Sequence, residues 1–211
     1  MFTILLTGFG PFPGTPFNPT TPLVKTLARL RRPALADATI IAHIFPTSYA
    51  AVDEELPKLI VRIRPDALLM FGLAPRTKKI RVETRARNAT SILPDVGGAS
   101  PRRHNVEVGA PTALPLPLPA RRLLSAVRSA RVPVALSHDA GGYLCNYLCW
   151  QAAEAARRPR GPRLAAFIHV PNVRHHARPR AAKRRFTLDD LARAGERLIV
   201  AIAARHGTKC S

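Results

Sequence analysis

The chain has 211 residues, 46% of them hydrophobic, which is enough for one sizeable core and predicts a single domain over residues 1–211. No run approaches the about 18 apolar residues of a membrane span, and the first residues lack the pattern of a signal peptide, so we expect no membrane segment and a cytoplasmic protein. The formal net charge of +20 keeps nonspecific binding of nucleic acid or another anionic surface open as an alternative.

Short apolar runs alternate with longer amphipathic segments along the chain, and this alternation is typical of an α/β fold with a mostly parallel sheet. The expected strands cover residues 2–7, 39–45, 67–71, 79–85, 133–137 and 164–169. A first helix is expected with Thr21 as its N-cap and Pro22 in its first position, and further helices over 49–63, 119–131, 144–157 and 187–205. The proline- and glycine-rich segment 88–119 predicts a long loop, which could form a lid or a subunit contact.

The basic residues gather in short groups at 29–32, 102–103, 121–122 and 157–163, which fall at predicted helix ends and in loops. Cations near a helix C-terminus are favoured by the helix dipole. Neither aromatic interleaving nor a helix-turn-helix, zinc or RNA-binding motif accompanies these groups. Their pattern therefore favours solvated surface over a specific nucleic-acid site.

Cys145 lies in the segment SHDAGGYLCNYLCW at 137–150, where a strand is expected to end, two glycines make a turn and a helix begins. A helix N-terminus stabilises a thiolate and offers free backbone N–H groups to an oxyanion, so this pattern fits a nucleophile; it also fits a small buried apolar residue. Cys149, one helical turn later, is expected in the core, and Cys210 is expected to be a free thiol. With only these three cysteines and no CxxC pair, we expect neither a disulfide framework nor a metal site.

His169 ends the apolar run LAAFIH at 164–169, and the carboxyl end of a buried strand is where α/β sheets place their ligand sites. Glu83 lies inside the predicted strand 79–85, between Arg81 and Arg85. A catalytic base with an acidic partner fits these positions. A core histidine and an ion pair at a sheet edge fit them as well.

The loop after the first strand, TGFGPFPGTPFNP at 7–19, contains three glycines but matches neither GxGxxG nor a P-loop. It carries Phe9, Phe12 and Phe17 near the predicted carboxyl edge of the sheet. Such an aromatic set fits the lining of a small-molecule pocket, or an anchor for the loop.

Together these segments resemble the pyroglutamyl peptidase I family, also called pyrrolidone-carboxylate peptidases. The matching segments occur in family order: TGFGPFPGTPFNP at 7–19, FPT at 45–47, FGLA at 71–74, VETRARN at 82–88, SHDAGGYLCN at 137–146 and FIHVP at 167–171. The resemblance implies a three-layer α/β/α sandwich around a twisted, mostly parallel mixed sheet. It also implies no metal or cofactor, N-terminally pyroglutamylated peptides as substrates, and homo-oligomers, either dimers or tetramers.

The resemblance further implies roles for particular residues. Cys145 would attack the carbonyl that joins pyroglutamate to the next residue, His169 would act as acid and base, and Glu83 would orient His169. The remaining site residues are implied to bind the substrate: Phe9 and Phe12 would sandwich the lactam ring, Tyr143 and Leu93 would add walls, and backbone groups around Gly72 would hydrogen-bond the lactam.

Two departures from the family pattern affect the predicted pocket. Leu73 stands where many members have glutamine. The Arg-Ile-Pro-Asp stretch that follows the catalytic acid in the family corresponds here to residues 92–95, Ile-Leu-Pro-Asp, so the family arginine is missing. Arg85 and Arg87 are candidates to replace its charge. These departures keep a related thiol hydrolase with another blocked acyl group open as an alternative.

Overall fold

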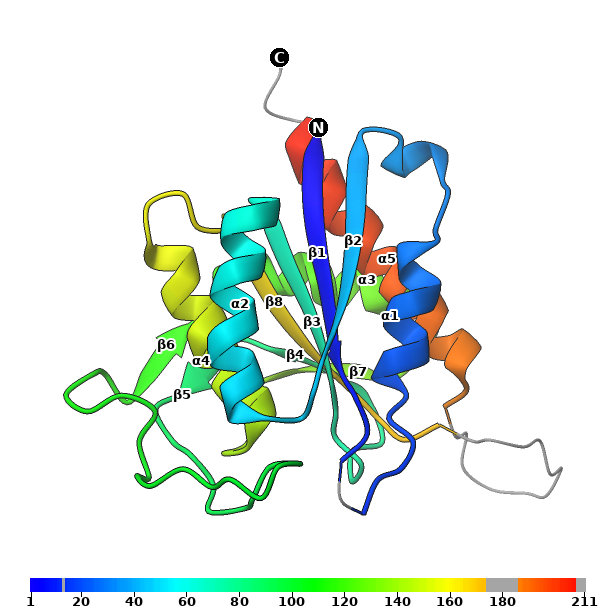
Figure 1. Ribbon diagram of the computed structural model, residues 1–211. Coiled ribbons are helices and arrows are strands. Elements are labelled where there is room, and N and C mark those ends of the chain that lie inside the picture. The colour runs from blue at the N-terminus through cyan, green and yellow to red at the C-terminus, as the bar shows by residue number, and fades with distance from the viewer. Residues whose placement is uncertain (13, 174–185, 208–211) are drawn as a thin grey trace, which may run out of the picture.

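The computed structural model describes residues 1–12, 14–173 and 186–207, in which helices cover both faces of a six-stranded sheet (Figure 1). The strands are β1 (Phe2–Phe9), β2 (Ala38–Phe45), β3 (Ala67–Leu73), β4 (Ile80–Glu83), β5 (Arg85–Arg87), β6 (Ala113–Pro115), β7 (Val134–Ser137) and β8 (Leu164–Val170). The helices are α1 (Thr20–Ala28), α2 (Tyr49–Ile63), α3 (Ala120–Ser129), α4 (Leu144–Arg157) and α5 (Leu188–Gly207), with a 3-10 turn at Pro33–Leu35.

The strand order in the large sheet is β2-β1-β3-β8-β4-β7. The first four of these strands are mutually parallel, whereas β4 runs antiparallel to β8 and parallel to β7. Strands β5 and β6 form a separate antiparallel pair. The prediction of an α/β/α sandwich around a mostly parallel mixed sheet is thus confirmed.

Two apolar cores lie on the two faces of the sheet. Helices α1, α3 and α5 pack on one face, and α2 and α4 pack on the other (Figure 1). Every residue of β3 and β8 is buried as a result, which explains why these strands read as continuous apolar runs. No helix in the described part of the chain is long and apolar enough to cross a membrane.

The start of α1 differs from the expected cap. The helix begins at Thr20, and Pro19, with no side-chain bond, takes the cap position. The hydroxyl of Thr20 instead donates to the carbonyl oxygen of Phe9 at 3.0 Å, and that of Thr21 donates to the same oxygen. Both threonines therefore hold α1 to the carboxyl end of β1, a tertiary contact that helix-start rules do not include.

The predicted strand 79–85 is divided in two. The part that belongs to the large sheet ends at Glu83, and the chain then leaves it at Thr84, because β5 pairs with β6 inside the segment 88–119 that we expected to be loop throughout. Strand β6 ends with Pro115, a residue that sequence rules exclude from central strands but that an edge strand accepts.

Candidate active site

The helix that carries Cys145 begins at a turn built by its neighbours. Gly141 has φ 85°, a left-handed conformation that favours glycine, and its N–H donates to the Asp139 carboxylate at 2.9 Å. Helix α4 then begins at Leu144, so that Cys145 is its second residue, and no side chain caps this end. The first backbone N–H groups of α4 therefore remain available to a negatively charged oxygen.

The Cys145 thiol lies directly above the sheet, where Gly72 leaves room for it. A Cβ atom placed on Gly72 would be 2.7 Å from Sγ of Cys145. Gly72 is also the register partner of His169 in the β3–β8 ladder, and adjacent strands are about 4.8 Å apart. The fold thus places the thiol above the strand next to that of His169, from a point 24 positions earlier in the chain.

His169 and Glu83 form a buried pair. Nδ1 of His169 is 2.7 Å from Oε1 of Glu83, and the residues are 3% and 0% exposed. The carboxylate can only accept, so Nδ1–H donates to it. The other ring nitrogen, Nε2, is consequently unprotonated in the neutral imidazole and can take a proton from a neighbouring group.

Burial sets the protonation states of the two reacting groups. Cys145 is half-buried as a residue, but the protein around its thiol raises the pKa to about 12; the Glu83 charge adds to this rise and the Arg81 charge opposes it. Burial also lowers the pKa of His169, although the hydrogen bond and charge of Glu83 raise it. These shifts favour a thiol and a neutral imidazole at neutral pH, an arrangement in which the imidazole can accept a proton.

Two residues predicted to bind the substrate, Tyr143 and Leu93, lie near this helix start. Tyr143 is half-buried and its hydroxyl donates to the carbonyl oxygen of Pro94 at 2.8 Å. Leu93, beside Pro94, is 58% exposed. The N–H of Ser91 donates to the carbonyl oxygen of Gly142, so the loop that follows β5 is held against the turn before Cys145.

The two predicted phenylalanines have different surroundings. Phe9 is 3% exposed and its ring packs against Phe45 at a centroid distance of 6.1 Å. Phe12 is half-buried in the loop after β1, where its backbone pairs with that of Thr15. Phe12 thus keeps part of its surface exposed whereas Phe9 does not, and the substrate-binding role of each stays a prediction.

Buried asparagines that the sequence did not single out support the site. Asn146, which follows Cys145 and is 0% exposed, accepts the N–H of Arg87 at 2.8 Å and donates to the carbonyl oxygens of Arg87 and Ala89. Asn18 donates to the carbonyl oxygen of Gly10 at 3.0 Å and so braces the phenylalanine loop. A buried asparagine has no sequence signal apart from its neighbours, which is why both were missed.

Among the arginines that the structure describes, Arg81 reaches the Glu83–His169 pair. The Arg85 guanidinium donates to the carbonyl oxygen of His138, and the Arg87 guanidinium donates to the Asp139 carboxylate, both at 2.9 Å. Arg81 instead lies 3.1 Å from Glu83. The guanidinium beside Glu83 therefore belongs to a residue of the same strand that precedes Glu83 in the chain.

The other predicted groups are accounted for as follows. Cys149 is fully buried in the core between α4 and the sheet, as expected, and both described cysteines are free thiols. Cys210 lies outside the described residues.

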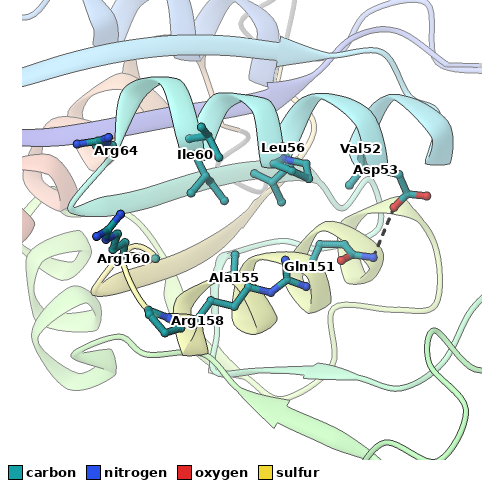
Figure 2. A pocket seen from close by; sticks show the side chains of 13 residues that line it. Val52, Asp53, Leu56, Ile60, Arg64, Gln151, Ala155, Arg158 and Arg160 are labelled. Atoms are coloured by element: carbon teal, nitrogen blue, oxygen red, sulfur yellow. Dashed lines mark hydrogen bonds between the residues drawn. The ribbon is translucent and has the colours of Figure 1, made fainter.

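An apolar cavity of about 340 Å³ lies elsewhere, between α2 and the C-terminal half of α4 (Figure 2). Its apolar walls include Leu56, Ile60 and Ala155, and Figure 2 shows Arg64 and Arg160 at one end and the bonded pair Asp53–Gln151 at the other. No cysteine or histidine lines it. This apolar cavity and the Cys145–His169–Glu83 cluster are therefore separate, and the cavity is not the candidate active site.

Comparison with known proteins agrees with this geometry. The pyroglutamyl peptidase family model matches residues 2–203. A pyrrolidone-carboxylate peptidase of Thermococcus kodakarensis is 37% identical over 169 residues, 80% of each chain, and that of Cupriavidus taiwanensis is 31% identical over 96% of this chain and 93% of its own. The crystal structure of pyroglutamyl peptidase I of Bacillus amyloliquefaciens superposes with a TM-score of 0.84 at 28% identity, covering 97% of this chain and 98% of that one. The chain therefore belongs to the pyroglutamyl peptidase family.

Proposed function

We propose that this chain is a cysteine peptidase that removes an N-terminal pyroglutamyl residue from peptides, with Cys145 as nucleophile, His169 as base and Glu83 as the residue that orients the base. The observation that carries the assignment is the buried 2.7 Å contact between Glu83 and Nδ1 of His169, on the strand beside Gly72, above which the Cys145 thiol lies. Membership in the family supplies the class of substrate.

The first half of the reaction forms a thioester. Sγ of Cys145 attacks the pyroglutamyl carbonyl carbon while Nε2 of His169 takes the thiol proton, and the carbonyl oxygen becomes an oxyanion. The free N–H groups at the start of α4 stabilise this charge. When the carbon–nitrogen bond breaks, the imidazolium returns the proton to the departing amine.

Water completes the cycle. His169 removes a proton from a water molecule as its oxygen attacks the thioester; the carbon–sulfur bond then breaks, the imidazolium returns the proton to the sulfur, and pyroglutamate and the thiol are released. Glu83 accepts the Nδ1–H bond throughout, so it fixes the ring orientation and stabilises each transient imidazolium.

The pocket that we propose suits a flat, neutral lactam without a free amine. Phe12 and the ring of Tyr143 supply apolar surface near the thiol, Leu93 closes the outer side, and backbone groups around Gly72 bond the lactam. Phe9 is buried in the core. Its contact with the lactam ring remains part of this proposal. No charged group is required to bind such a ligand.

The decisive experiment measures amine release from a series of aminoacyl-coumarin amides blocked or unblocked at the N-terminus. We expect hydrolysis of the pyroglutamyl amide, complete loss after alkylation of Cys145, and little hydrolysis of the prolyl, acetyl-alanyl and formyl-methionyl analogues. The prolyl analogue is the matched control because it differs chiefly in the lactam carbonyl and the charge on nitrogen. Preference for another blocked group would establish a related thiol hydrolase instead.

We further propose a homo-oligomer in the cytoplasm. The support for an assembly is the apolar surface on the segment between β5 and β6, where Ile92 is 73% and Val108 is 67% exposed. The support for a reducing compartment is the dependence of the mechanism on a free thiol at Cys145. Light scattering during size-exclusion chromatography tests the first point, and a monomeric mass at micromolar concentration would contradict it.

A further inference from the structure

Arg81 touches both partners of the buried acid–base pair. It lies two residues before Glu83 on β4, and the alternation of a strand therefore places both side chains on the same face of the sheet. Its Nε is 3.1 Å from Oε1 of Glu83, and its Nη2 is 3.2 Å from Nδ1 of His169 and 3.4 Å from the carbonyl oxygen of Asp139.

The contact with Glu83 reduces the free-energy cost of burying this carboxylate. Glu83 is 0% exposed, and a carboxylate that loses its hydration costs free energy unless a cation or a hydrogen-bond donor lies nearby. Within the described part of the chain, Oε2 of Glu83 has no hydrogen-bond partner, and Oε1 carries both the imidazole and the guanidinium. Arg81 is thus the cation that compensates this buried charge.

The contact of Arg81 with His169 is, in contrast, repulsive. Nδ1 already donates its hydrogen to Glu83, so it cannot also accept one from Arg81, and the two positive or partly positive groups repel each other. The Arg81 charge accordingly lowers the pKa of His169, and it also lowers the pKa of the Cys145 thiol. Both effects favour a neutral base and an ionised sulfur.

We propose that Arg81 is a positioning residue for the reaction: its guanidinium compensates the charge of Glu83, which bonds Nδ1 of His169, and so offsets the effect of that charge on the Cys145 thiol. This proposal rests on the roles given above to Cys145 and His169. The mechanism otherwise relies on a buried acid whose own charge disfavours the thiolate, and Arg81 offsets that effect.

Other ionisable groups near the sulfur and the imidazole must be considered in any pH experiment. They are Glu83, Asp139, Tyr49, Tyr143 and Cys149. Glu83 and Asp139 are anions that raise the pKa of the groups they act on, and the tyrosines and Cys149 are neutral below their own raised pKa values. Within residues 1–12, 14–173 and 186–207, Arg81 is the cation that acts on both Cys145 and His169.

The test follows alkylation of Cys145 by iodoacetamide against pH, with mass spectrometry to identify the modified cysteine. Arg81→Met keeps much of the side-chain volume and removes the charge. We expect the inflection of its alkylation profile to move to higher pH by about one unit, which is about tenfold slower modification below the inflection. Arg81→Lys restores a charge at this position and should move the inflection back toward the wild type.

The matched control is Arg85→Met. It removes the same charge from a residue four positions along the chain, whose guanidinium bonds the carbonyl oxygen of His138. Its profile should coincide with that of the wild type. An unshifted Arg81→Met profile, or an equal shift in Arg85→Met, overturns the proposal. Circular dichroism checks folding, and Arg81→Gln replaces Arg81→Met in the same measurement if the methionine variant is unfolded.

Alkylation needs no substrate, so this result is independent of the proposed peptidase activity. A wild type that fails to hydrolyse pyroglutamyl amides would contradict the proposed function and would leave the Arg81 effect measurable. In an active enzyme, the acid limb of kcat/KM for Arg81→Met should also move to higher pH, because loss of the guanidinium removes a charge that disfavours the imidazolium of His169.

Discussion

Gly72→Ala tests whether the free space above Gly72 on β3 determines the position of the Cys145 thiol. The added methyl carbon would lie 2.7 Å from Sγ of Cys145, and 2.6 and 2.8 Å from Cζ and Cε1 of Phe167. Non-bonded heavy atoms ordinarily stay about 3.5–4.0 Å apart. The sulfur or the ring must therefore move by about 1 Å, since β3 lies between two other strands of the sheet and is buried throughout.

The size of the effect follows from this displacement. Overpacking of a close-packed interior costs about 1–3 kcal/mol of unfolding free energy. A reacting group misplaced by about 1 Å loses about a hundredfold in rate. We therefore expect Gly72→Ala to fold with reduced stability and to lose about a hundredfold in kcat/KM.

Gly195→Ala is the matched control, because its added carbon would lie 2.5 Å from Cδ1 of Leu27, in the core on the opposite face of the sheet. The assay compares denaturant unfolding with kcat/KM per folded molecule for both variants. Gly195→Ala should lower the free energy of unfolding and leave kcat/KM per folded molecule unchanged. A Gly72→Ala enzyme with full kcat/KM would show that the thiol does not react from the position above Gly72, and would refute this account of the site.

Three further predictions concern the reacting groups and the pocket. Cys145→Ala should abolish turnover, whereas Cys149→Ala should lower stability and retain turnover; equal losses of activity would contradict the choice of nucleophile. Glu83→Gln should lower kcat by about tenfold to ten-thousandfold. It should also move the acid limb of kcat/KM to lower pH, because the carboxylate raises the pKa of His169. An acid limb at the wild-type pH would show that Glu83 does not act on the base. Phe12→Ala should raise KM for a pyroglutamyl amide by the loss of about 1–3 kcal/mol of apolar contact, and an unchanged KM would exclude its ring from the pocket.

The order and type of the main elements were accessible from the sequence because they depend on local rules. Strands β3 and β8 are continuous apolar runs, and α2 and α4 carry long apolar faces, so periodicity and length identify them. Helices α2 and α4 were predicted with the bounds that the structure has. Their regularity leaves little room for tertiary contacts to move the ends.

The contacts around Glu83 were not accessible from the sequence. Neighbouring arginines at 81, 85 and 87 look equivalent in the sequence, but only the first shares a face of β4 with Glu83 in the large sheet. The chain leaves that sheet at Thr84. This exit depends on the pairing of β5 with β6, in which Arg85 lies opposite Pro115, 30 positions later in the chain. Non-local pairing of this kind decides which arginine reaches the acid.

The register of three strands, rather than any single motif, assembles the site. Gly72, His169 and Arg81 form one row across β3, β8 and β4, while Glu83 pairs with Phe167 one row deeper. Because Phe167 lies two positions before His169 on β8, the Glu83 carboxylate reaches Nδ1 while staying fully buried. The thiol of Cys145 lies above Gly72, in the row of His169. Because side chains alternate between faces, a slip of β4 by one residue would turn both Arg81 and Glu83 toward α3 and leave His169 without either partner. The short antiparallel strand β4 is thus the element whose pairing determines whether the acid, the base and the cation meet.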